Sequence, residues 1–480
     1  MVDVKQLLGI LIMQYSIVNF QSVVDSSHSL RLDAEFFHPD YLKIQHQLEK
    51  IGSHRLIDFQ VKIRHPKEIK RNYVDEGVLL LRGQNVRPLS IDLTSNPVYI
   101  SEEDAERLKE NTIRYKNILI MRSGANVGQC AIYLENNDAI SMSDTLIIQS
   151  GNLNPFFLTI FLNTKYGAKF IERGKYGSAQ PHIAPPFLYQ IPIPVYESLP
   201  TLIEKVYLYS KDIKELSKTC YTEAQTLLLS ELGLAGWQPK QQLTFVKNFS
   251  DMENAGRIDA DYFQPKYDEI VNAINNYSGG SDTLGNLCST KRGSLIKDSF
   301  YDEKKGTPYI RGADFSGGVL SDNKLVFINS EFERTNETQV FENDIVFSLI
   351  GSVGETALVT KEFTGSYISN NTGKIHSKSP NFSITLHVLL ASIIGELYFE
   401  KYKTQTAQPK ISDKDLHNFV IPILADEKQT EIQQKVLESF RLRNQSKDLL
   451  ESAKRAVEIA IEQDEQAAIE WLESVQRVDV

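Results

Sequence analysis

The stretch from residue 199 to residue 233 constrains the fold most, because its apolar residues keep to one stripe of an α-helix. Steps of three and four residues alternate along it, which is the spacing of a coiled-coil seam. The predicted seam consists of Leu199, Leu202, Val206, Tyr209, Ile213, Leu216 and Cys220. Gly233 stands where a glycine would cap the end of the helix. About 35 residues at about 1.5 Å each predict a helix of roughly 50 Å.

A second helical stretch, at about residues 426–472, aligns with the first at an offset of 230 residues. The alignment continues outside the helices, where a heptad pattern cannot imitate it. The repeated blocks are residues 31–41 with 257–267, 80–83 with 309–312, 117–128 with 344–354, 179–183 with 407–411, and 191–193 with 421–423. Five blocks in the same order indicate a duplicated chain.

Each copy is predicted to be an α+β globule followed by a long helix. Short β-rich segments separated by Gly, Asn and Ser turns favour a mixed, largely antiparallel sheet, with helices near residues 156–170 and 384–402. The expected domains are residues 1–196 (globule), 197–236 (helix), 237–424 (globule) and 425–480 (helix).

Composition limits the compartment and the partners. Three scattered cysteines among 480 residues predict neither a disulfide framework nor a zinc site, which fits the cytoplasm. Residues 6–24 carry no charge, and residues 7–13 within this stretch resemble a signal-peptide core. The stretch contains the polar Gln14 and Asn19 and has no cleavage site, so export and a membrane are not expected. The net charge of −10 argues at first against nucleic acid, but half of it lies after residue 424.

Catalytic motifs are only approached. The segments 96–99 and 154–157 begin with Asn-Pro but lack the second proline of an amino-methyltransferase motif, and they are interpreted as turns. Asp40, Glu49 and Lys50 could form a nuclease site, but Lys266 stands opposite Asp40 in the second copy. The glycine turns are not followed by Gly-Lys-Ser/Thr and bind no phosphate. The sequence therefore predicts no catalysis, no metal and no cofactor.

What remains is a binding protein with two similar readers. Basic loops occur at equivalent places in both copies, and each is either a solvated surface or a nucleic-acid contact. Arg82, Gln84 and Asn85 have side chains that pair with guanine and adenine edges, or they cap the end of a strand. Gln180 and Gln408 could read bases or fix a turn. The residues expected to contact DNA are Lys62, Arg64, Lys67, Lys70, Arg82, Gln84, Asn85, Asn126 and Gln180 in the first copy, and Lys291, Arg292, Lys297, Arg311, Ser352, Gln408 and Lys410 in the second.

The ordered, duplicated motifs resemble the specificity subunits of type I restriction-modification systems over the whole chain. The resemblance implies that the two helices pair antiparallel, set the spacing between two target-recognition domains and dock two methyltransferase subunits. Each domain would read one half of a bipartite double-stranded DNA target, and a motor-nuclease subunit would join for cleavage. The family often has Asn after the glycine turn, where this chain has Ser143 and Asn370.

The chain is therefore predicted to be a non-catalytic, cytoplasmic DNA-recognition subunit. The alternative is a protein-interaction scaffold with two ligand-binding globules on a coiled coil, which the net charge of −10 keeps open. The residues expected in helix pairing and partner docking are Leu202, Val206, Tyr209, Ile213, Leu216, Ile432, Val436, Arg443, Leu450 and Val457.

Overall fold

The computed structural model describes residues 16–18, 20–26, 31–68, 72–93, 97–177, 180–302, 305–321, 325–329, 332, 338–404 and 407–478. The chain forms two compact units. Unit 1 consists of Met1–Lys214 and Asn444–Val480, and unit 2 of Glu215–Arg443. Each unit combines a sheet-containing globule with parts of the two long helices, so the four domain boundaries expected from the sequence stay a prediction.

Unit 1 contains two four-stranded sheets among its described residues, with strand orders β2-β11-β8-β9 and β6-β3-β10-β7. Pairing is antiparallel except between β3 and β10, which run parallel. The strands are β1 (Ser53–Arg55), β2 (Lys62–Arg64), β3 (Val78–Leu81), β4 (Val86–Arg87), β5 (Ser90–Ile91), β6 (Tyr99–Ile100), β7 (Thr112–Ile113), β8 (Ile118–Met121), β9 (Cys130–Ile132), β10 (Ala139–Ser141), β11 (Thr145–Gln149) and β12 (Pro192–Pro194).

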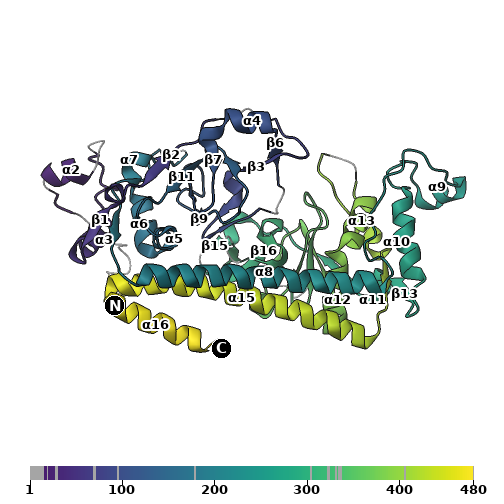
Figure 1. The fold of residues 1–480 in the computed structure, drawn as a ribbon. Helices are drawn as coiled ribbons and strands as arrows, with labels where there is room; N and C mark the ends of the chain where they lie inside the picture. The colour runs from purple at the N-terminus through teal and green to yellow at the C-terminus, as the bar shows by residue number, and fades with distance from the viewer. Residues whose placement is uncertain are drawn as a thin grey trace. The chain divides into compact units, whose positions relative to one another are not determined.

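The helices of this globule are α2 (Phe20–Ser26), α3 (Pro39–Lys50), α4 (Glu102–Arg107), α5 (Pro155–Asn163), α6 (Lys165–Arg173) and α7 (Pro185–Leu188) (Figure 1). The single helix expected near residues 156–170 is in fact two. Thr164 interrupts it, because its hydroxyl accepts a hydrogen bond from the Gly167 N–H at 3.2 Å and caps a new helix. Asn154 caps α5 by accepting from Phe156 and Phe157, which accounts for one of the Asn-Pro segments. In the other such segment, Asn96 lies outside the described residues.

Unit 2 repeats this plan. Its described residues form a six-stranded sheet, β14-β23-β20-β21-β18-β17, and a four-stranded sheet, β15-β19-β16-β22. The strands are β13 (Ser281–Thr283), β14 (Ser289–Arg292), β15 (Tyr301–Asp302), β16 (Thr307–Ile310), β17 (Phe315–Ser316), β18 (Gly318–Leu320), β19 (Val326–Ile328), β20 (Ile345–Ser348), β21 (Thr356–Leu358), β22 (Tyr367–Ile368), β23 (Thr372–His376) and β24 (Val420–Pro422).

The core of unit 2 lies between the six-stranded sheet and its helices. Phe347 of the sheet packs near Phe399 of α13, with ring centroids 6.4 Å apart. The expected helix near residues 384–402 is again two helices, because the hydroxyl of Ser392 caps the second one. The helices are α9 (Phe249–Ala255), α10 (Pro265–Asn275), α11 (Leu284–Leu287), α12 (Pro380–Leu390), α13 (Ile393–Tyr402) and α14 (Asp413–His417).

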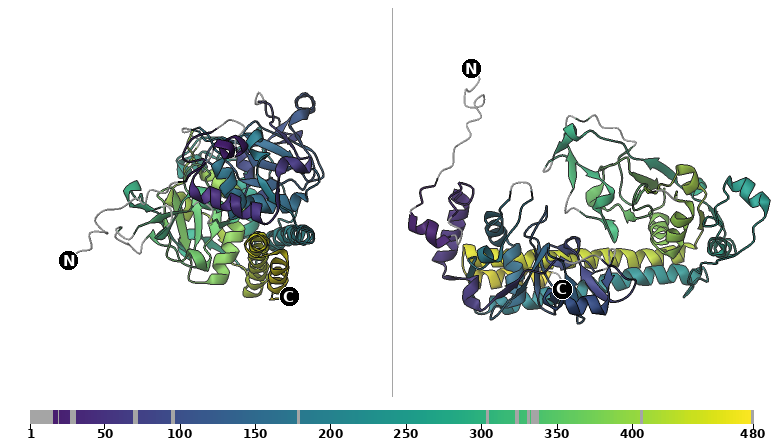
Figure 2. Two further views of the ribbon diagram at one scale, coloured as in Figure 1. Left: turned by 90° about the vertical axis from the view of Figure 1, so that its left-hand side faces the viewer. Right: turned by 90° about the horizontal axis from the view of Figure 1, so that it is seen from above.

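The long helices are α8 (Leu199–Glu231) and α15 (Asp426–Glu462), which lie side by side and antiparallel (Figure 1 and Figure 2). The second predicted helix ends earlier than expected, and α16 (Glu465–Val478) follows it. Asp464 causes this break, since its carboxylate accepts from the Ala467 N–H at 2.8 Å. The neighbouring Glu465 carboxylate accepts from the backbone N–H groups of Ser198 and Leu199, each at 2.7 Å, and so stabilises the start of α8.

The buried stripe of α8 corrects the predicted seam at every second position. Leu199, Val206, Ile213 and Cys220 are buried as expected, but Tyr209 and Leu216 are each 51% exposed. The stripe runs instead through Ser210 and Ser217, which follow these two positions, and the predicted Leu202 is only partly buried. The other members of the stripe are Ile203, Ala224 and Leu228.

Serine pairs explain the shift of the seam. In unit 1 the Ser210 hydroxyl donates to the Ser446 carbonyl at 2.9 Å, and Ser446 donates back to the Ser210 carbonyl at 2.8 Å. In unit 2 Ser217 and Ser439 make the same exchange at 2.8 and 2.7 Å. A small side chain that hydrogen-bonds to the backbone of the opposite helix lets two helices approach closely. A search for apolar heptad positions misses such a residue because serine is polar.

The positions expected to pair on α15 divide in the same way. Ile432, Val436 and Val457 are buried, whereas Leu450 is only partly buried. Arg443 was expected on the seam, but its guanidinium donates to the Gly317 carbonyl of the unit 2 globule at 3.2 Å. Burying a charged guanidinium in an apolar seam costs more free energy than hydrogen-bonding it to a backbone carbonyl near the surface.

Candidate functional site

Three loops of unit 2 meet where its strands end. β16 and β22 are parallel, with Ile310 opposite Ile368, so the loops that follow them start side by side. β20 is antiparallel to β23, with Ser348 opposite Thr372, which brings the glycine turn to the same place. The loop of residues 369–371 therefore connects the two sheets of the unit next to the ends of β16 and β20.

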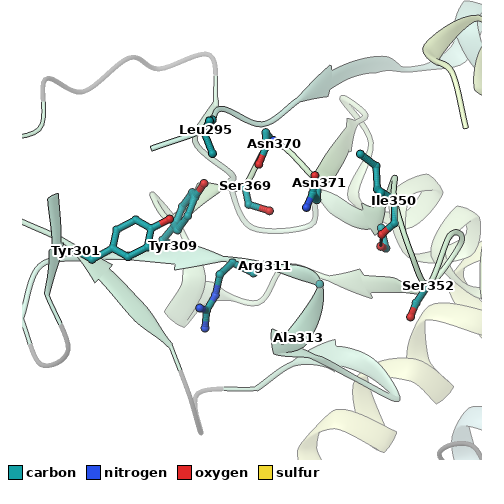
Figure 3. A pocket seen from close by; sticks show the side chains of 12 residues that line it. Leu295, Tyr301, Tyr309, Arg311, Ala313, Ile350, Ser352, Ser369, Asn370 and Asn371 are labelled. Carbon is teal, nitrogen blue, oxygen red and sulfur yellow. Dashed lines mark hydrogen bonds between the residues drawn. The ribbon is translucent and has the colours of Figure 1, made fainter. Parts of the chain in front are cut away.

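A pocket of about 450 Å³ lies between these loops (Figure 3). It is lined by Leu295, Tyr301, Tyr309, Arg311, Gly312, Ala313, Ser348, Ile350, Ser352, Ser369, Asn370 and Asn371. Figure 3 shows Ser369, Asn370 and Asn371 in one loop, with Arg311 and Ala313 across the pocket from them. Arg311 and Ser352 were predicted as contact residues, and here both line the same pocket.

Basic side chains lie beside the 369–371 loop. The Arg292 guanidinium at the end of β14 donates through Nε to the Asn370 carbonyl at 2.6 Å. Lys291 and Lys297 are exposed on the same segment. The predicted basic loop of the second copy therefore borders the pocket rather than standing apart from it.

Burial changes the titration of the groups beneath the pocket. Tyr309 is 1% exposed, and burial raises the pKa of its hydroxyl to about 12, so it stays protonated and donates to the Ser294 carbonyl. Burial also raises the pKa of Asp314, even though its carboxylate accepts from the Arg311 backbone N–H at 2.8 Å. Arg311 lies within 3.4 Å of the same carboxylate and is partly neutralised by it.

Unit 1 has the same loops, held by matching hydrogen bonds. Arg122 N–H donates to the Asp144 carbonyl at 2.8 Å, as Leu349 does to Asn371 at 2.9 Å. The ring of His65 lies 3.0 Å from the Ser143 carbonyl, in the place of Arg292. Ser143 also hydrogen-bonds to Glu68. Equivalent backbone therefore carries acidic and hydroxyl side chains in unit 1 and amides in unit 2.

Asn85, one of the predicted contact residues of unit 1, has a structural role. Asn85 is 4% exposed, and its amide bonds to the Arg82 N–H at 2.9 Å and to the Asp92 carbonyl at 2.8 Å. It caps a strand end because both polar ends of its side chain find backbone partners. Gln84, between them, is exposed, and Arg82 is half-buried.

The basic loop of unit 1 is also partly committed. The Arg64 guanidinium donates to the carbonyls of Glu110 and Thr112 at 2.7 and 2.8 Å, and burial lowers its pKa. Arg64 therefore holds a neighbouring segment in place. Lys67 forms an exposed ion pair with Glu110 at 2.7 Å, Lys62 is exposed on β2, and Lys70 lies outside the described residues.

The repeated Gln-Pro segments fasten the glycine turns. The Pro181 carbonyl accepts from Gly124 at 3.3 Å, and the Pro409 carbonyl accepts from Gly351 at 3.2 Å. Gln180, Gln408 and Lys410 are exposed beside these bonds, while Asn126 and Ser352 lie within the turns themselves. This arrangement favours a turn-fixing role for the segments.

The last glycine of each turn has no room for a side chain. At Gly354, with φ +94°, a Cβ would come within 2.5 Å of the Phe399 ring of α13. At Gly128, with φ +96°, it would meet Ile171 of α6 at 2.4 Å. These glycines therefore let each turn pack closely against a helix of the same unit.

Sequence reasoning missed Tyr301, Ser369 and Asn371 as pocket residues. Asn371 carried a signal, because it directly follows the Asn370 that the family resemblance singled out. Tyr301 and Ser369 gave none, since their convergence depends on the crossing between two sheets.

The described residues offer no cluster of metal ligands and no single helix that could span a membrane. They contain no group of three or more His, Cys, Asp or Glu side chains that could hold a metal ion. Among them, no single helix is long and apolar enough to cross a membrane. One pair, α12 with α13, reaches the required length and composition only when taken together across a 70° bend.

The part of unit 2 that contains the pocket is similar to known proteins. Residues 281–452, which contain the whole pocket, match the family model "Type I restriction modification DNA specificity domain". The specificity subunit of the Escherichia coli type I restriction enzyme EcoBI is 27% identical over 164 residues. This match covers 33% of the chain and 34% of that subunit, or about a third of the curated relative.

Two solved structures are similar over most of the chain. The type I restriction-modification S subunit from M. genitalium is 12% identical, with 88% of this chain and 95% of that chain covered and a TM-score of 0.37. The HsdS subunit from Thermoanaerobacter tengcongensis is 15% identical, with 84% and 96% covered and a TM-score of 0.27. The chain is similar to type I restriction-modification specificity subunits, and its residues 281–452 match the model of their DNA specificity domain.

Proposed function

We propose that the chain is the sequence-specific DNA-recognition subunit of a type I restriction-modification complex, in which each unit reads one half of a bipartite duplex. The main observation that supports this proposal is the pocket of unit 2. Its uncommitted amides and neighbouring cations lie within the matched specificity domain, and unit 1 repeats the same loop framework. Amides suit base edges and exposed cations suit phosphates.

The partners in this proposal are two methyltransferase subunits, docked on the long helices, and a restriction motor-nuclease. The outward apolar residues Tyr209, Leu216 and Leu437 support docking, since they are 49–51% exposed. In unit 2 a hollow of about 590 Å³ also lies between the outer sides of α8 and α15. Methylation and cleavage would reside in the partners, and the chain itself would act in the cytoplasm without a cofactor.

Binding to randomised duplexes, followed by a salt titration, tests the proposal directly. The full chain, alone and with its methyltransferase subunits, is expected to select a bipartite sequence and to lose affinity steeply with salt. Binding without sequence preference or salt dependence would favour the protein-interaction scaffold. Turnover of DNA by the pure chain with methyl donor, ATP and magnesium would contradict a non-catalytic role.

Exchange of residues 41–190 for the matching part of a relative tests the assignment of one half-site to each unit. Only one half of the selected sequence should change. A change in both halves would contradict two independent readers.

The long helices are proposed to set the spacing between the half-sites. Seven residues inserted between Ser210 and Ser217, together with seven between Ser439 and Ser446, preserve the stripe and both serine pairs. Each helix then grows by about 10 Å, or roughly three base pairs of DNA. Duplexes selected by the folded variant should have a spacer longer by about two to four base pairs and bind more weakly, because the second site is also rotated. An unchanged spacer preference would show that the helices do not set the distance.

A further inference from the structure

The 369–371 loop of unit 2 is held rigidly through its backbone. The Asn370 carbonyl accepts from Arg292 at 2.6 Å, and the Asn371 carbonyl accepts from the Leu349 N–H at 2.9 Å. Ser369 is anchored by its N–H on the Ile310 carbonyl at 2.9 Å, and its hydroxyl lies 3.0 Å from that of Thr372. The side chains of this loop therefore start from fixed positions.

The amide groups of this loop are available for a ligand. Among the described residues, the side chains of Asn370 and Asn371 take part in no hydrogen bond, and Asn371 is exposed at the pocket rim. Structural asparagines usually find local backbone partners, as Asn85 does in unit 1. A fixed loop that presents two unengaged amides beside a cationic segment suits a ligand with a paired donor and acceptor.

The hydrogen-bonding groups of the four bases indicate which base an asparagine amide would bind. In the major groove, adenine presents an N6 amino donor next to the N7 acceptor, which one asparagine amide matches with two hydrogen bonds. Guanine presents two acceptors there, cytosine an amino donor, and thymine an acceptor with a methyl group. We propose that Asn371, supported by Asn370, reads an adenine in the half-site bound by unit 2. This inference rests on the proposed function.

The neighbouring charges fit a duplex around that adenine. Apart from its two tyrosines, Arg311 is the one ionisable residue in the pocket lining, and its partner Asp314 is 2% exposed beneath it. Lys297 and Arg292 are exposed on the adjoining segment, where they could contact phosphates. The positive charges around the amides therefore favour a negatively charged polymer over a positively charged ligand.

Unit 1 cannot make the same pair at the equivalent place. Asp144 stands opposite Asn371, and one of its carboxylate oxygens accepts from the Gly83 N–H at 3.0 Å. A carboxylate has no donor for adenine N7. The adenine requirement at this position is accordingly confined to one half of the target, so the two halves differ even though their frameworks match.

Selection from a randomised duplex library with the full chain, alone and with its methyltransferase subunits, tests the inference. Asn371→Ala should abolish the adenine preference at one position of one half-site, by about 5- to 150-fold in relative affinity. Asn371→Asp should move the preference there toward cytosine, whose amino group a carboxylate accepts. Asn272→Ala, an exposed asparagine on α10 of the same unit, is the matched control and should leave all preferences unchanged.

The outcomes separate this inference from the function on which it rests. Unchanged adenine preference in folded Asn371→Ala, or an equal loss of affinity for every sequence, would overturn the role of Asn371 while the wild type still selects a bipartite site. Absence of any sequence preference in the wild type would overturn the proposed function itself. Urea unfolding followed by Trp237 fluorescence verifies that unit 2 of each variant is folded.

Discussion

The buried serine pairs should contribute measurably to the stability of each unit separately. Ser210→Ala removes the hydroxyl that donates to the Ser446 carbonyl at 2.9 Å in unit 1. That carbonyl still accepts a hydrogen bond within its own helix, so no buried group loses its last partner. The expected loss is therefore that of one net hydrogen bond, about 1 kcal/mol in the free energy of unfolding.

The double variant sharpens the expectation. Ser210→Ala with Ser446→Ala removes both reciprocal bonds and should cost about 2 kcal/mol or somewhat less. The two hydroxyls also lie 2.9 Å apart, and such neighbours are not independent. By contrast, Ser210→Leu would push the helices apart and should cost about 1–3 kcal/mol through overpacking.

The two tryptophans allow each unit to be observed alone. Trp471 belongs to unit 1 and Trp237 to unit 2, and the chain has no other tryptophan. In a Trp237→Phe background, urea unfolding followed by fluorescence should show the lower stability of Ser210→Ala. In a Trp471→Phe background, the same substitution should leave the transition unchanged, and Ser217→Ala should lower it.

The matched control is Ser230→Ala, an exposed serine of α8, which should change stability by less than about 0.5 kcal/mol. For units of this size, 1 kcal/mol corresponds to a Tm shift of about 2–4 °C. If Ser210→Ala were as stable as the wild type, or more stable, the hydroxyls would contribute nothing to helix pairing. That result would refute the reasoning from hydrogen-bond geometry.

Three further outcomes are expected. Burial lowers the pKa of His387 to about 4, so between pH 6.5 and 4 the unfolded state binds a proton that the folded state does not bind. The free energy of unfolding of unit 2 should therefore fall by up to about 3 kcal/mol as the pH falls from about 6.5 to 4. His387→Gln should reduce this pH dependence, as measured by urea unfolding. The raised pKa of Asp314 means that wild-type stability falls as the pH rises above about 4, so Asp314→Asn should gain more in Tm at pH 7 than at pH 4. Lys62→Ala should weaken DNA binding on all sequences and lower the salt slope by about one, whereas Arg64→Ala should chiefly lower the Tm of unit 1.

The heptad pattern predicted the long helices and half of their seam. Leu199, Val206 and Ile213 are buried as expected, because they are apolar. The alternate positions were assigned to Tyr209 and Leu216, since these are the larger apolar residues, but the helices pack on Ser210 and Ser217. Each serine stabilises the contact by donating a hydrogen bond to a carbonyl of the other helix. The spacing of apolar residues along one helix cannot predict a bond to another helix.

The candidate site was predictable in its framework but not in its side chains. The Arg-Gly strand end and the glycine turn of the second copy, both recognised as repeated motifs, line one pocket. Asn85 was predicted as a base reader because of its amide, yet that amide is used by backbone groups. Whether an amide is free depends on how the nearby backbone folds around it, as it does around Asn85, and this becomes visible only in the folded chain.

The division of the chain has a consequence for its synthesis. Unit 2 is a single segment, Glu215–Arg443, and can fold as soon as it is made, whereas unit 1 lacks Asn444–Val480 until after unit 2 has been made. The missing segment supplies Ser446 and the Glu465 carboxylate at the start of α8. At about 5–20 residues per second, the first part of unit 1 waits roughly 10–50 s for it. The unit whose first part emerges first from the ribosome is thus completed only after the other unit has been made.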